Sequence, residues 1–546
     1  MALTEDQIQH FIDRETKGRS DAAVWRSHVQ ECAEVFKPRK AKMEMRATAG
    51  DKRHTSVWNG TPEDALDVAA AGIHSETMPA DAQWGVFEPD SEVEAEDKGN
   101  KKWCQDATKG VMAGFHESNF NVQSHEAIVD ILYAGIANTY MKEGKKKAFH
   151  FSTRNVFEYV YFESEEGEID TAMGTIELTA RQAREKFKEN AGKPVFEAIK
   201  RNELEKKFPY LHLVVPRKDR DTTKGGVLNA PFAEYYILKE EKHVAEEKGY
   251  YEFPFLTPRG SKTFGEIAGR SQAMKALGVG HALQVMEVNT LEAGEKRVRP
   301  SIVATNQGWQ AAITGQAGTV NYNDNYSQQG SPPISEFPGG GDPGWGREEI
   351  NGKEEELKRY FCVRAFEMED IKSDVTLGER QMRKLEKVKQ IAPLLHRFFY
   401  EYIRRAMERG LSILIRRGDI PEPPEGLSKL KIAMRSPLFL LLQHGADMEA
   451  IHAMYEEAAF IAEKRLAFGE ALVFDNLDDD KALRAIEKRW NPPVDMMVDP
   501  QVVEEKRQAR DEKQAAQEQM EVMGQGVDMA SKMGVTPDGM DVQNIQ

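Results

Sequence analysis

Cysteine is scarce in this 546-residue chain, which has only Cys32, Cys104 and Cys362, far apart and without a CxxC pair. Disulfide frameworks and thiolate zinc sites need closely spaced cysteines, so the sequence predicts neither. We expect the three to be buried thiols in a reducing compartment. The longest apolar stretches, such as Pro437–Leu442, are far too short to span a bilayer. The polar start Met1–Asp6, with no basic and then apolar leader, predicts an intracellular protein.

The chain also lacks an excess of basic residues: 74 Lys and Arg stand against 90 Asp and Glu, a net charge of -16 at pH 7. Proteins that hold nucleic acid tightly are usually basic, because neutralising phosphates supplies most of their nonspecific affinity. The acidic balance therefore argues against stable DNA wrapping. It is compatible with a surface that DNA slides past, where strong binding would hinder the movement of DNA.

Signatures of catalysis are missing as well. No GxxxxGK[ST] phosphate-binding loop occurs, and neither His116 nor His125 begins a complete HExxH motif. A GxGxxG spacing ends at Gly344, but Pro343 interrupts it and no strand precedes it, so a plain loop is the better interpretation. The sequence thus predicts no catalytic residue, no metal site and no cofactor.

The hydrophobic pattern predicts an α+β protein that is mainly helical. Apolar residues at helical spacing mark the helices, and alternating aromatic and polar residues mark the strands. In the N-terminal half we expect three helices: one that ends at Phe36, one that starts near Pro62 with Thr61 as its N-cap, and one over 124–141. A strand–turn–strand unit over 149–176 and strands at 210–216 and 234–239 are expected to follow. In the C-terminal half we expect helices over 266–296 and 345–366, a Pro- and Gly-rich excursion at 300–346, and a long helix capped by Thr376 and Glu379, kinked at Pro393 and stopped by Gly418.

Two charge clusters are ambiguous from the residues alone. The glutamates of the run Glu354–Glu356 are consecutive, so they point around a helix instead of converging as a two-metal nuclease site requires. A solvated helix face is the preferred interpretation. The basic cluster Lys296–Arg299 is either ordinary surface or a contact with DNA or a partner protein.

Several segments resemble, in order, the portal (head-to-tail connecting) proteins of short-tailed bacteriophages. The most informative is Phe253–Leu277, which keeps Gly269-Arg270-Ser271 before a long helix but has Ala268 where the family usually has an aromatic residue. The other matching segments are Trp25 with Phe36–Pro38, Thr61–Trp84, Glu117–Phe120, Asp130–Gly135, Val375–Thr376 with Pro393, and Gly418–Leu427.

The resemblance implies the phage portal fold, with wing, stem, clip and crown, assembled as a ring of about twelve subunits with a central channel. The wing would comprise residues 1–268 and the long kinked helix at 376–429. The other implied parts are stem helices at 269–297 and 346–364, the clip at 298–345, the tunnel loop at 365–375, the crown at 430–500, and a C-terminal helix and flexible tail at 501–546.

The same resemblance assigns candidate site residues by their place in that architecture. The tunnel loop would project into the channel, and an acidic or mixed wall would let DNA pass without being held. The tunnel-loop candidates are Glu367, Glu369, Asp370, Lys372 and Asp374. The candidate DNA-channel contacts are Lys372, Lys296, Arg297, Arg299, Glu354, Glu355 and Glu356.

The implied function is structural and non-enzymatic: a ring at the capsid vertex through which the genome is packaged and ejected. Expected partners are further copies of the chain, the terminase packaging motor, a tail adaptor protein, the major capsid and scaffolding proteins, and double-stranded DNA in the channel, with no membrane. The expected location is the virion, and the host cytoplasm during assembly. One alternative is a viral nucleic-acid enzyme (a nuclease or packaging ATPase), which would need a phosphate loop or converging carboxylates. The other is a capsid scaffolding protein, which the seven tryptophans and the β-containing body disfavour.

Overall fold

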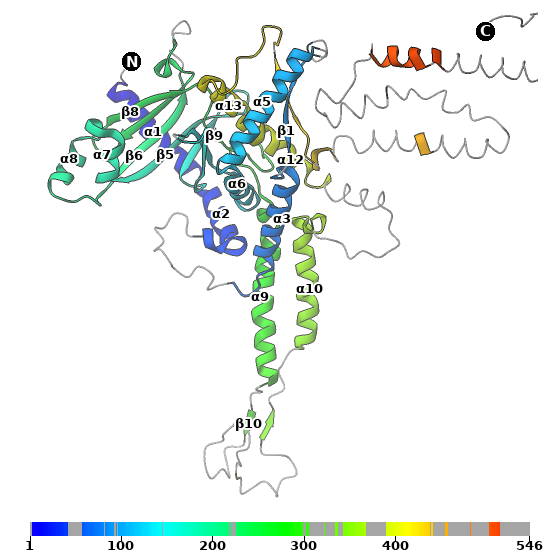
Figure 1. The fold of residues 1–546 in the computed structure, drawn as a ribbon. Helices are drawn as coiled ribbons and strands as arrows, with labels where there is room; N and C mark the ends of the chain where they lie inside the picture. The colour runs from blue at the N-terminus through cyan, green and yellow to red at the C-terminus, as the bar shows by residue number, and fades with distance from the viewer. Residues whose placement is uncertain are drawn as a thin grey trace, which may run out of the picture. The chain divides into compact units, whose positions relative to one another are not determined.

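The computed structural model describes residues 3–440 apart from 42–56, 81, 92–93, 95–96, 145, 218–219, 221–224, 299–301, 305–321, 323–333, 337–341, 367–388, 428 and 437. Beyond residue 440 it describes 454–456, 481, 502–510 and 512–513. The chain divides into two units, Met1–Ala95 with Trp103–Ala450 and Glu96–Lys102 with Ile451–Gln546. The first unit contains both helices and sheets, which confirms the predicted mixed fold (Figure 1).

The N-terminal helices that the structure describes are α1 (Glu5–Asp21), α2 (Ala23–Phe36), α3 (Thr61–Thr77), α5 (Lys98–Glu117) and α6 (Phe120–Ala134). The predicted end of α2 at Phe36 is confirmed. Thr61 is the first residue of α3 and not its N-cap; its N–H donates to Asn59 Oδ1 at 2.9 Å. The helix expected over 124–141 is too long, because Gly135 adopts a left-handed φ of 80° and ends α6 at Ala134.

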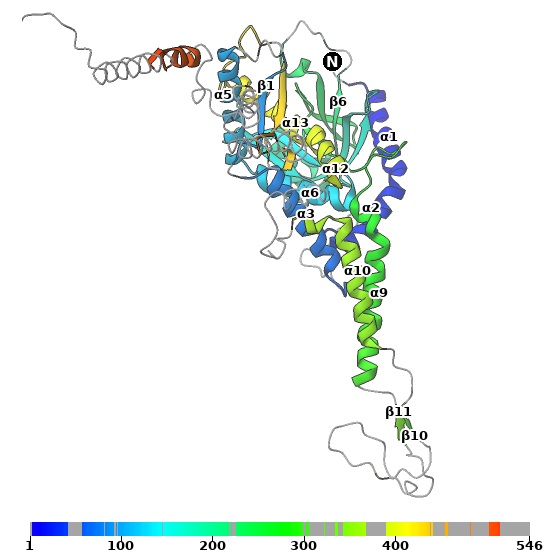
Figure 2. The same cartoon turned by 90° about the vertical axis from the view of Figure 1, so that its right-hand side faces the viewer.

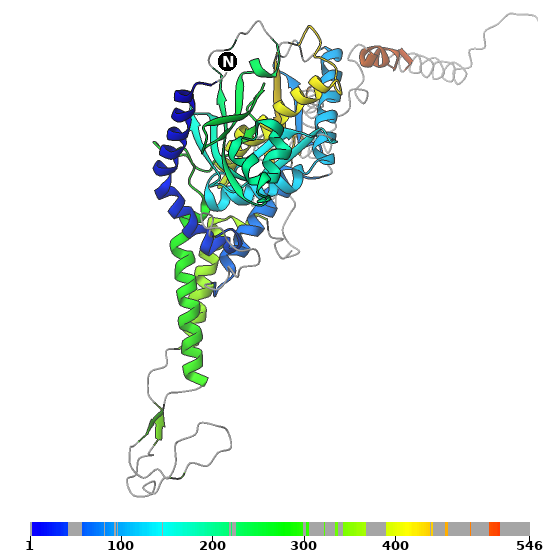
Figure 3. The same ribbon diagram turned by 90° about the vertical axis from the view of Figure 1, so that its left-hand side faces the viewer.

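The largest sheet is antiparallel, with the strand order β4-β5-β6-β7-β8. Its strands are β4 (Tyr159–Glu163), β5 (Ile169–Thr179), β6 (Lys207–Pro216), β7 (Phe232–Leu238) and β8 (His243–Tyr250). Alternate residues face opposite sides of a strand, and both sides are covered. Leu211 packs with Ile8 of α1, whereas Tyr210 packs with α7 (Ala180–Phe187) and α8 (Lys193–Lys200) (Figures 1 and 3). The predicted strands over 149–176, 210–216 and 234–239 are confirmed.

Two smaller sheets lie in the same unit beside the largest one. The strands β2 (Thr139–Glu143), β3 (Phe149–Thr153) and β9 (Phe255–Leu256) form one of them in the order β3-β2-β9. In the other, β1 (Gly85–Pro89) pairs antiparallel with β12 (Leu430–Met434). The first residues of the stretch expected to form the crown therefore pair with a strand from the N-terminal part of the chain.

Two helices, α9 (Gln272–Val298) and α10 (Pro343–Tyr360), lie side by side and extend from the sheets and N-terminal helices of the first unit (Figures 1 and 2). Following α9 and preceding α10 in the chain, β10 (Ile302–Ala304) pairs antiparallel with β11 (Ile334–Glu336). The helix predicted from residue 266 begins later, at Gln272, because residues 261–270 form a loop closed by a bridge between Ser261 and Arg270.

The long helix predicted from Thr376 is described only in its second half. The capping residues Thr376 and Glu379 lie outside the described residues. Pro393 lies in the first turn of α12 (Ala392–Phe398), where a proline is tolerated, and turn residues 390–391 precede this helix. The part of the predicted long helix before Lys389, on which the kink depends, lies outside the described residues. The π-helical segment η5 (Phe399–Ile403) and α13 (Arg404–Arg417) continue from it, and Gly418 ends α13 with a φ of 79°. The predicted stop at Gly418 is therefore confirmed.

The cysteines are free thiols. Cys32 and Cys104 are buried, whereas Cys362 is only partly buried. Burial raises the pKa of Cys32 to about 12 and that of Cys104 to about 11. The prediction of buried thiols is confirmed for these two, and their protonated form at neutral pH makes them unreactive.

Candidate functional site

The first of the three consecutive glutamates, Glu354, lies in α10 and is held by Asn59, two residues before α3. Its Oε1 accepts a hydrogen bond from Asn59 Nδ2 at 2.9 Å, and the same amide donates to Glu287 Oε2 of α9 at 3.2 Å. Gln284 of α9 in turn donates to the Asn59 carbonyl at 2.8 Å. Glu354 therefore helps to fix α9, α10 and the start of α3 together, a role that the sequence pattern did not indicate.

The next two glutamates are neutralised within the chain. Glu355 forms ion pairs with Arg364 and Lys358, and the hydrogen bond from Arg364 is the largest cause that lowers the pKa of its carboxyl. Glu356 accepts a hydrogen bond from Lys353 at 2.7 Å. Two of the three carboxylates in this run are therefore balanced by basic side chains of the same chain.

The basic candidates lie elsewhere on the helix pair. Lys296 and Arg297 are exposed in the last turn of α9, where the partial negative charge of a helix C-terminus favours cations. Lys296 comes nine residues after Glu287, a separation of roughly 13 Å along the axis of α9. Glu354 lies at the level of Glu287, because the Asn59 amide bonds both carboxylates. The structure therefore does not bring the acidic and basic candidates together. Outside the described residues lie Arg299, Glu367, Glu369, Asp370, Lys372 and Asp374.

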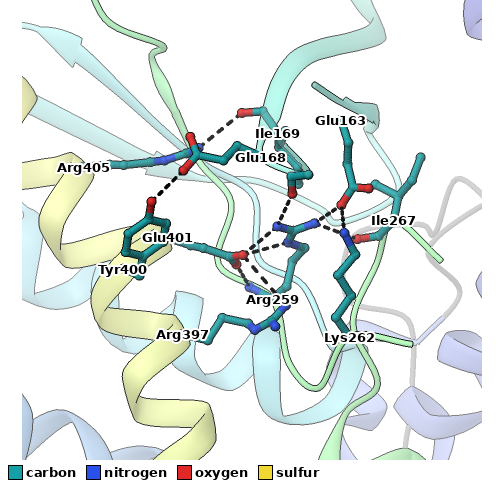
Figure 4. A network of polar contacts seen from close by, with 11 residues as sticks. Glu163, Glu168, Ile169, Arg259, Lys262, Ile267, Arg397, Tyr400, Glu401 and Arg405 are labelled. Carbon is teal, nitrogen blue, oxygen red and sulfur yellow. Dashed lines mark hydrogen bonds and ion pairs between the residues drawn. The ribbon is translucent and has the colours of Figure 1, made fainter. Parts of the chain in front are cut away.

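A buried ion pair, which sequence reasoning missed, joins two segments of the first unit that lie far apart in the sequence (Figure 4). Arg259 follows β9 and Glu401 belongs to η5, and their side chains are 5% and 9% exposed. The Glu401 carboxylate accepts hydrogen bonds from Arg259 Nε at 3.0 Å, Nη2 at 2.6 Å and the backbone N–H at 2.8 Å. Burial alone would lower the pKa of Arg259, but the hydrogen bonds to Glu401 outweigh it and the pKa is raised.

The remaining donors of Arg259 reach two further segments. Its Nη1 donates to the Glu163 carboxylate of β4, and its Nη2 donates to the Gly167 carbonyl at 3.1 Å in the β4–β5 turn. Lys262, in the loop that precedes α9, pairs with the same Glu163 at 2.5 Å (Figure 4). One guanidinium therefore ties together the β4–β5 hairpin, the π-helical segment and the residues that lead into α9.

Three glycines make close backbone contact where α9 begins. The Gly260 N–H donates to the Gly135 carbonyl at 2.8 Å. A Cβ atom on Gly269 would lie 2.5 Å from Gly260 N and 2.8 Å from Gly135 O, so no side chain fits there. This contact gives a physical reason for glycine in the segment Gly269-Arg270-Ser271 that carried the family resemblance.

A second buried cluster lies in the largest sheet around Glu234, which is 2% exposed. The donors to its carboxylate are His212 Nε2 at 2.9 Å and the hydroxyls of Tyr250, Tyr140 and Tyr236 at 3.0, 3.1 and 3.2 Å. Burial would raise the pKa of Glu234, but these hydrogen bonds, led by that from His212, lower it to about 2. Burial lowers the pKa of His212, which we therefore assign as neutral with its proton on Nε2. With its carboxylate occupied by side chains of the same fold, Glu234 stabilises the sheet.

The low pKa of Glu234 predicts a pH dependence of stability. Since the pKa is lower in the folded chain than the ordinary 4.5, the carboxylate contributes stability that is present above about pH 4.5 and is lost as the pH falls through about 2. In Glu234→Gln this contribution is absent at every pH. The difference in free energy of unfolding between wild type and variant should therefore shrink by up to roughly 3 kcal/mol between about pH 5 and pH 2, measured by urea denaturation. A difference that stays constant across this range would contradict the assignment.

No metal centre accompanies these clusters in the part of the chain that the structure describes. There, no three or more histidine, cysteine, aspartate or glutamate side chains are grouped so that they could hold a metal ion. Within the same residues, none of the helices combines the length and the apolar character needed to cross a membrane.

Known proteins resemble the chain over nearly its whole length. The family described as bacteriophage head to tail connecting protein matches residues 9–498. A probable portal protein of Bordetella phage BPP-1 is 24% identical over 533 residues, which cover 94% of this chain and 93% of the relative. A portal protein of Salmonella phage epsilon15 is 23% identical over 541 residues, which cover 97% and 96%. These matches confirm the resemblance seen in the sequence. The chain belongs to the family of bacteriophage head to tail connecting (portal) proteins, which have a structural role at the capsid vertex.

Proposed function

We propose that copies of this chain assemble into a ring of about twelve, whose central channel carries DNA into the capsid during packaging and out of it during ejection. The observation that supports this most directly is the pair α9–α10, which extends from the body of a chain that belongs to the connector family (Figure 2). Repeated around an axis, such a pair forms a wall of helices around a channel.

In this proposal the parts follow the order expected from the sequence, with the start of the crown moved. The helix pair forms the stem, and the sheets with the N-terminal helices form the wing. The segment 298–345, which contains β10 and β11, forms the clip, where the packaging motor and later the tail adaptor dock. Residues 365–375 form the tunnel loop. Because β12 pairs with β1 of the wing, we place the start of the crown after Met434, inside the capsid with its coat and scaffolding proteins.

The charges on the helix pair support a channel that DNA passes without being held. Glu355 and Glu356 are each paired with a basic residue of their own chain, and Glu354 is bonded to Asn59. A wall of mixed charge offers phosphates few unpaired cations, so it adheres weakly to DNA. The exposed Lys296 and Arg297, with Arg299, supply a few weak phosphate contacts in this proposal.

The ring is tested by negative-stain electron microscopy of the purified protein, together with the mass from light scattering. We expect rings with a central hole and a mass near that of a dozen chains. A stable, compact monomer or dimer would contradict the proposal. An assay for nuclease activity with divalent metal would then test the alternative of a nucleic-acid enzyme.

Neutralising Lys372 should alter the packaging or retention of DNA while leaving the ring assembled. In the proposal this lysine lies in the tunnel loop and touches passing phosphates, whereas it takes no part in contacts between copies. The measurement compares packaged DNA per particle for Lys372→Gln and wild type, with ring assembly checked by light scattering. Rings that fail to form in the variant would show that Lys372 has a structural role instead.

A further inference from the structure

The loop that connects β9 to α9 carries a phenylalanine outside the packed interior. Two backbone hydrogen bonds between Ser261 and Arg270, at 3.1 and 2.7 Å, close the base of the loop, and Lys262 anchors it to Glu163 of β4. Phe264, near the tip, has a relative exposure of 103%. A ring in this position contributes nothing to the stability of its own chain, because an aromatic side chain is stabilising when its surface is removed from water.

A hollow of about 310 Å³ lies next to the tip of this loop. Residues 265–268, which directly follow Phe264, form part of its wall, together with the α1–α2 junction and β4. Val24 and Ile267 in this wall are 84% and 37% exposed, so the hollow opens to the surface.

The size and the lining of the hollow suit a phenyl ring. An apolar cavity of about 150 Å³ is enough to hold benzene, and this hollow is larger. Its aromatic lining residues are Trp25, Tyr159, Tyr161 and Phe162. Aromatic rings pack favourably against one another in offset or edge-to-face arrangements, so the wall offers good partners for another ring.

The tip of the loop can move while its base stays fixed. The Glu266 N–H donates to the Thr263 carbonyl at 3.2 Å, so Phe264 and Gly265 are the central residues of a turn. Gly265 has a φ of 79°, and a Cβ atom there would have nothing within 4 Å. Since glycine adopts positive and negative φ about equally readily, Gly265 can change its backbone angles in open space and turn Phe264 with it.

We propose that residues 261–270 form a lid, in which Phe264 turns about Gly265 and enters the hollow between the α1–α2 junction and β4. The structure shows the open position. In the closed position one ring contacts both the N-terminal helices and the edge strand of the largest sheet, and it fastens them to the segment that leads into α9. The lid is a property of the single chain, so it goes beyond the proposed ring and does not depend on it.

Hydrogen exchange of the full-length protein tests whether the lid closes. Phe264 is fully exposed in the open position, so a lid that stays open predicts no effect of Phe264→Ser. A lid that closes predicts faster exchange at the backbone amides of β4 and of the start of α2, which border the hollow. We expect an increase of about tenfold or more, because burying a phenylalanine ring shifts a local opening equilibrium by at least that factor.

Leu228→Ser is the matched control for this substitution. Leu228 is 61% exposed in η3 (Val227–Asn229), which packs against β8, at the opposite edge of the largest sheet from β4. Its replacement should leave the exchange in β4 unchanged. If Phe264→Ser has no more effect on β4 than Leu228→Ser, the lid does not close and the proposal is wrong.

A second variant tests whether the hollow is where the ring goes. Ala22 lines the hollow, and Ala22→Leu fills part of it. In that background Phe264→Ser should change the exchange in β4 by less than about twofold, because two substitutions that act on one contact are not additive. An undiminished effect of Phe264→Ser in the Ala22→Leu protein would show that the ring acts elsewhere, and would overturn the assignment.

Photo-crosslinking identifies what the ring contacts. Full-length protein with p-benzoylphenylalanine in place of Phe264 is irradiated, and the linked peptides are identified by mass spectrometry. We expect links within one chain, from position 264 to residues 18–28 or 156–162, which line the hollow. Links between copies, links confined to other segments or the absence of links would each contradict the lid.

Discussion

Replacing Glu401 with leucine is expected to lower the free energy of unfolding by about 3–5 kcal/mol. The variant leaves Arg259 charged and buried, and three of its hydrogen bonds lose their acceptor. Arginine cannot escape this cost by losing its proton at neutral pH. Urea denaturation followed by tryptophan fluorescence measures the loss.

Two comparisons separate this effect from the general effect of a substitution. Glu408→Gln breaks the exposed pair with Arg404, whose side chains are 45% and 49% exposed, and should cost less than about 1 kcal/mol. The double variant Arg259→Leu with Glu401→Leu removes both charges, and should therefore be less destabilised than the sum of the single variants. Additive losses, or a loss for Glu401→Leu no larger than for Glu408→Gln, would contradict the assigned role.

Gly269→Ala is expected to cost about 3 kcal/mol, at the upper end for added volume in a packed interior. The new methyl group would meet backbone atoms of Gly260 and Gly135, which cannot turn away as the end of a flexible side chain can. Since the contact sets the start of α9, hydrogen exchange should also quicken in the first turns of that helix. Denaturation and exchange are both measured on the purified protein.

The matched control for this substitution is Gly225→Ala. A Cβ atom at Gly225 would have nothing within 4 Å, so its effect should stay within about 0.5 kcal/mol. Equal stability of the Gly269 and Gly225 variants would show that the backbone at Gly269 can relax, and would remove the physical reason given for glycine there.

The parts of the fold that could be predicted depend on short-range signals. Pro38 follows the end of α2 and Gly418 ends α13, because each acts on the backbone immediately around it. The β4–β5 hairpin follows from alternating residues and the turn at Gly167.

The functional features that were missed are contacts between residues far apart in the chain. Arg259 and Glu401 are separated by 142 residues, and nothing local to Glu401 marks the π-helical segment that holds it. The side chain of Glu354 was expected on a solvated face or in the channel, but Asn59, 295 residues earlier, holds it. Helical spacing places residues on a face, whereas the partner of that face is set by the tertiary fold.

The pairing of β1 with β12 has a consequence for how the chain is made. Arg435 and Glu88, which form an ion pair across this two-stranded sheet, are 347 residues apart. At a synthesis rate of about 5–20 residues per second, β1 emerges from the ribosome roughly 20–70 s before its partner strand. During that interval Val86 and Phe87, which are 5% and 3% exposed in the finished fold, still lack the strand that pairs with them. Nascent chains of this protein are therefore expected to engage chaperones until residue 434 has been translated, and truncations that end before β12 should aggregate.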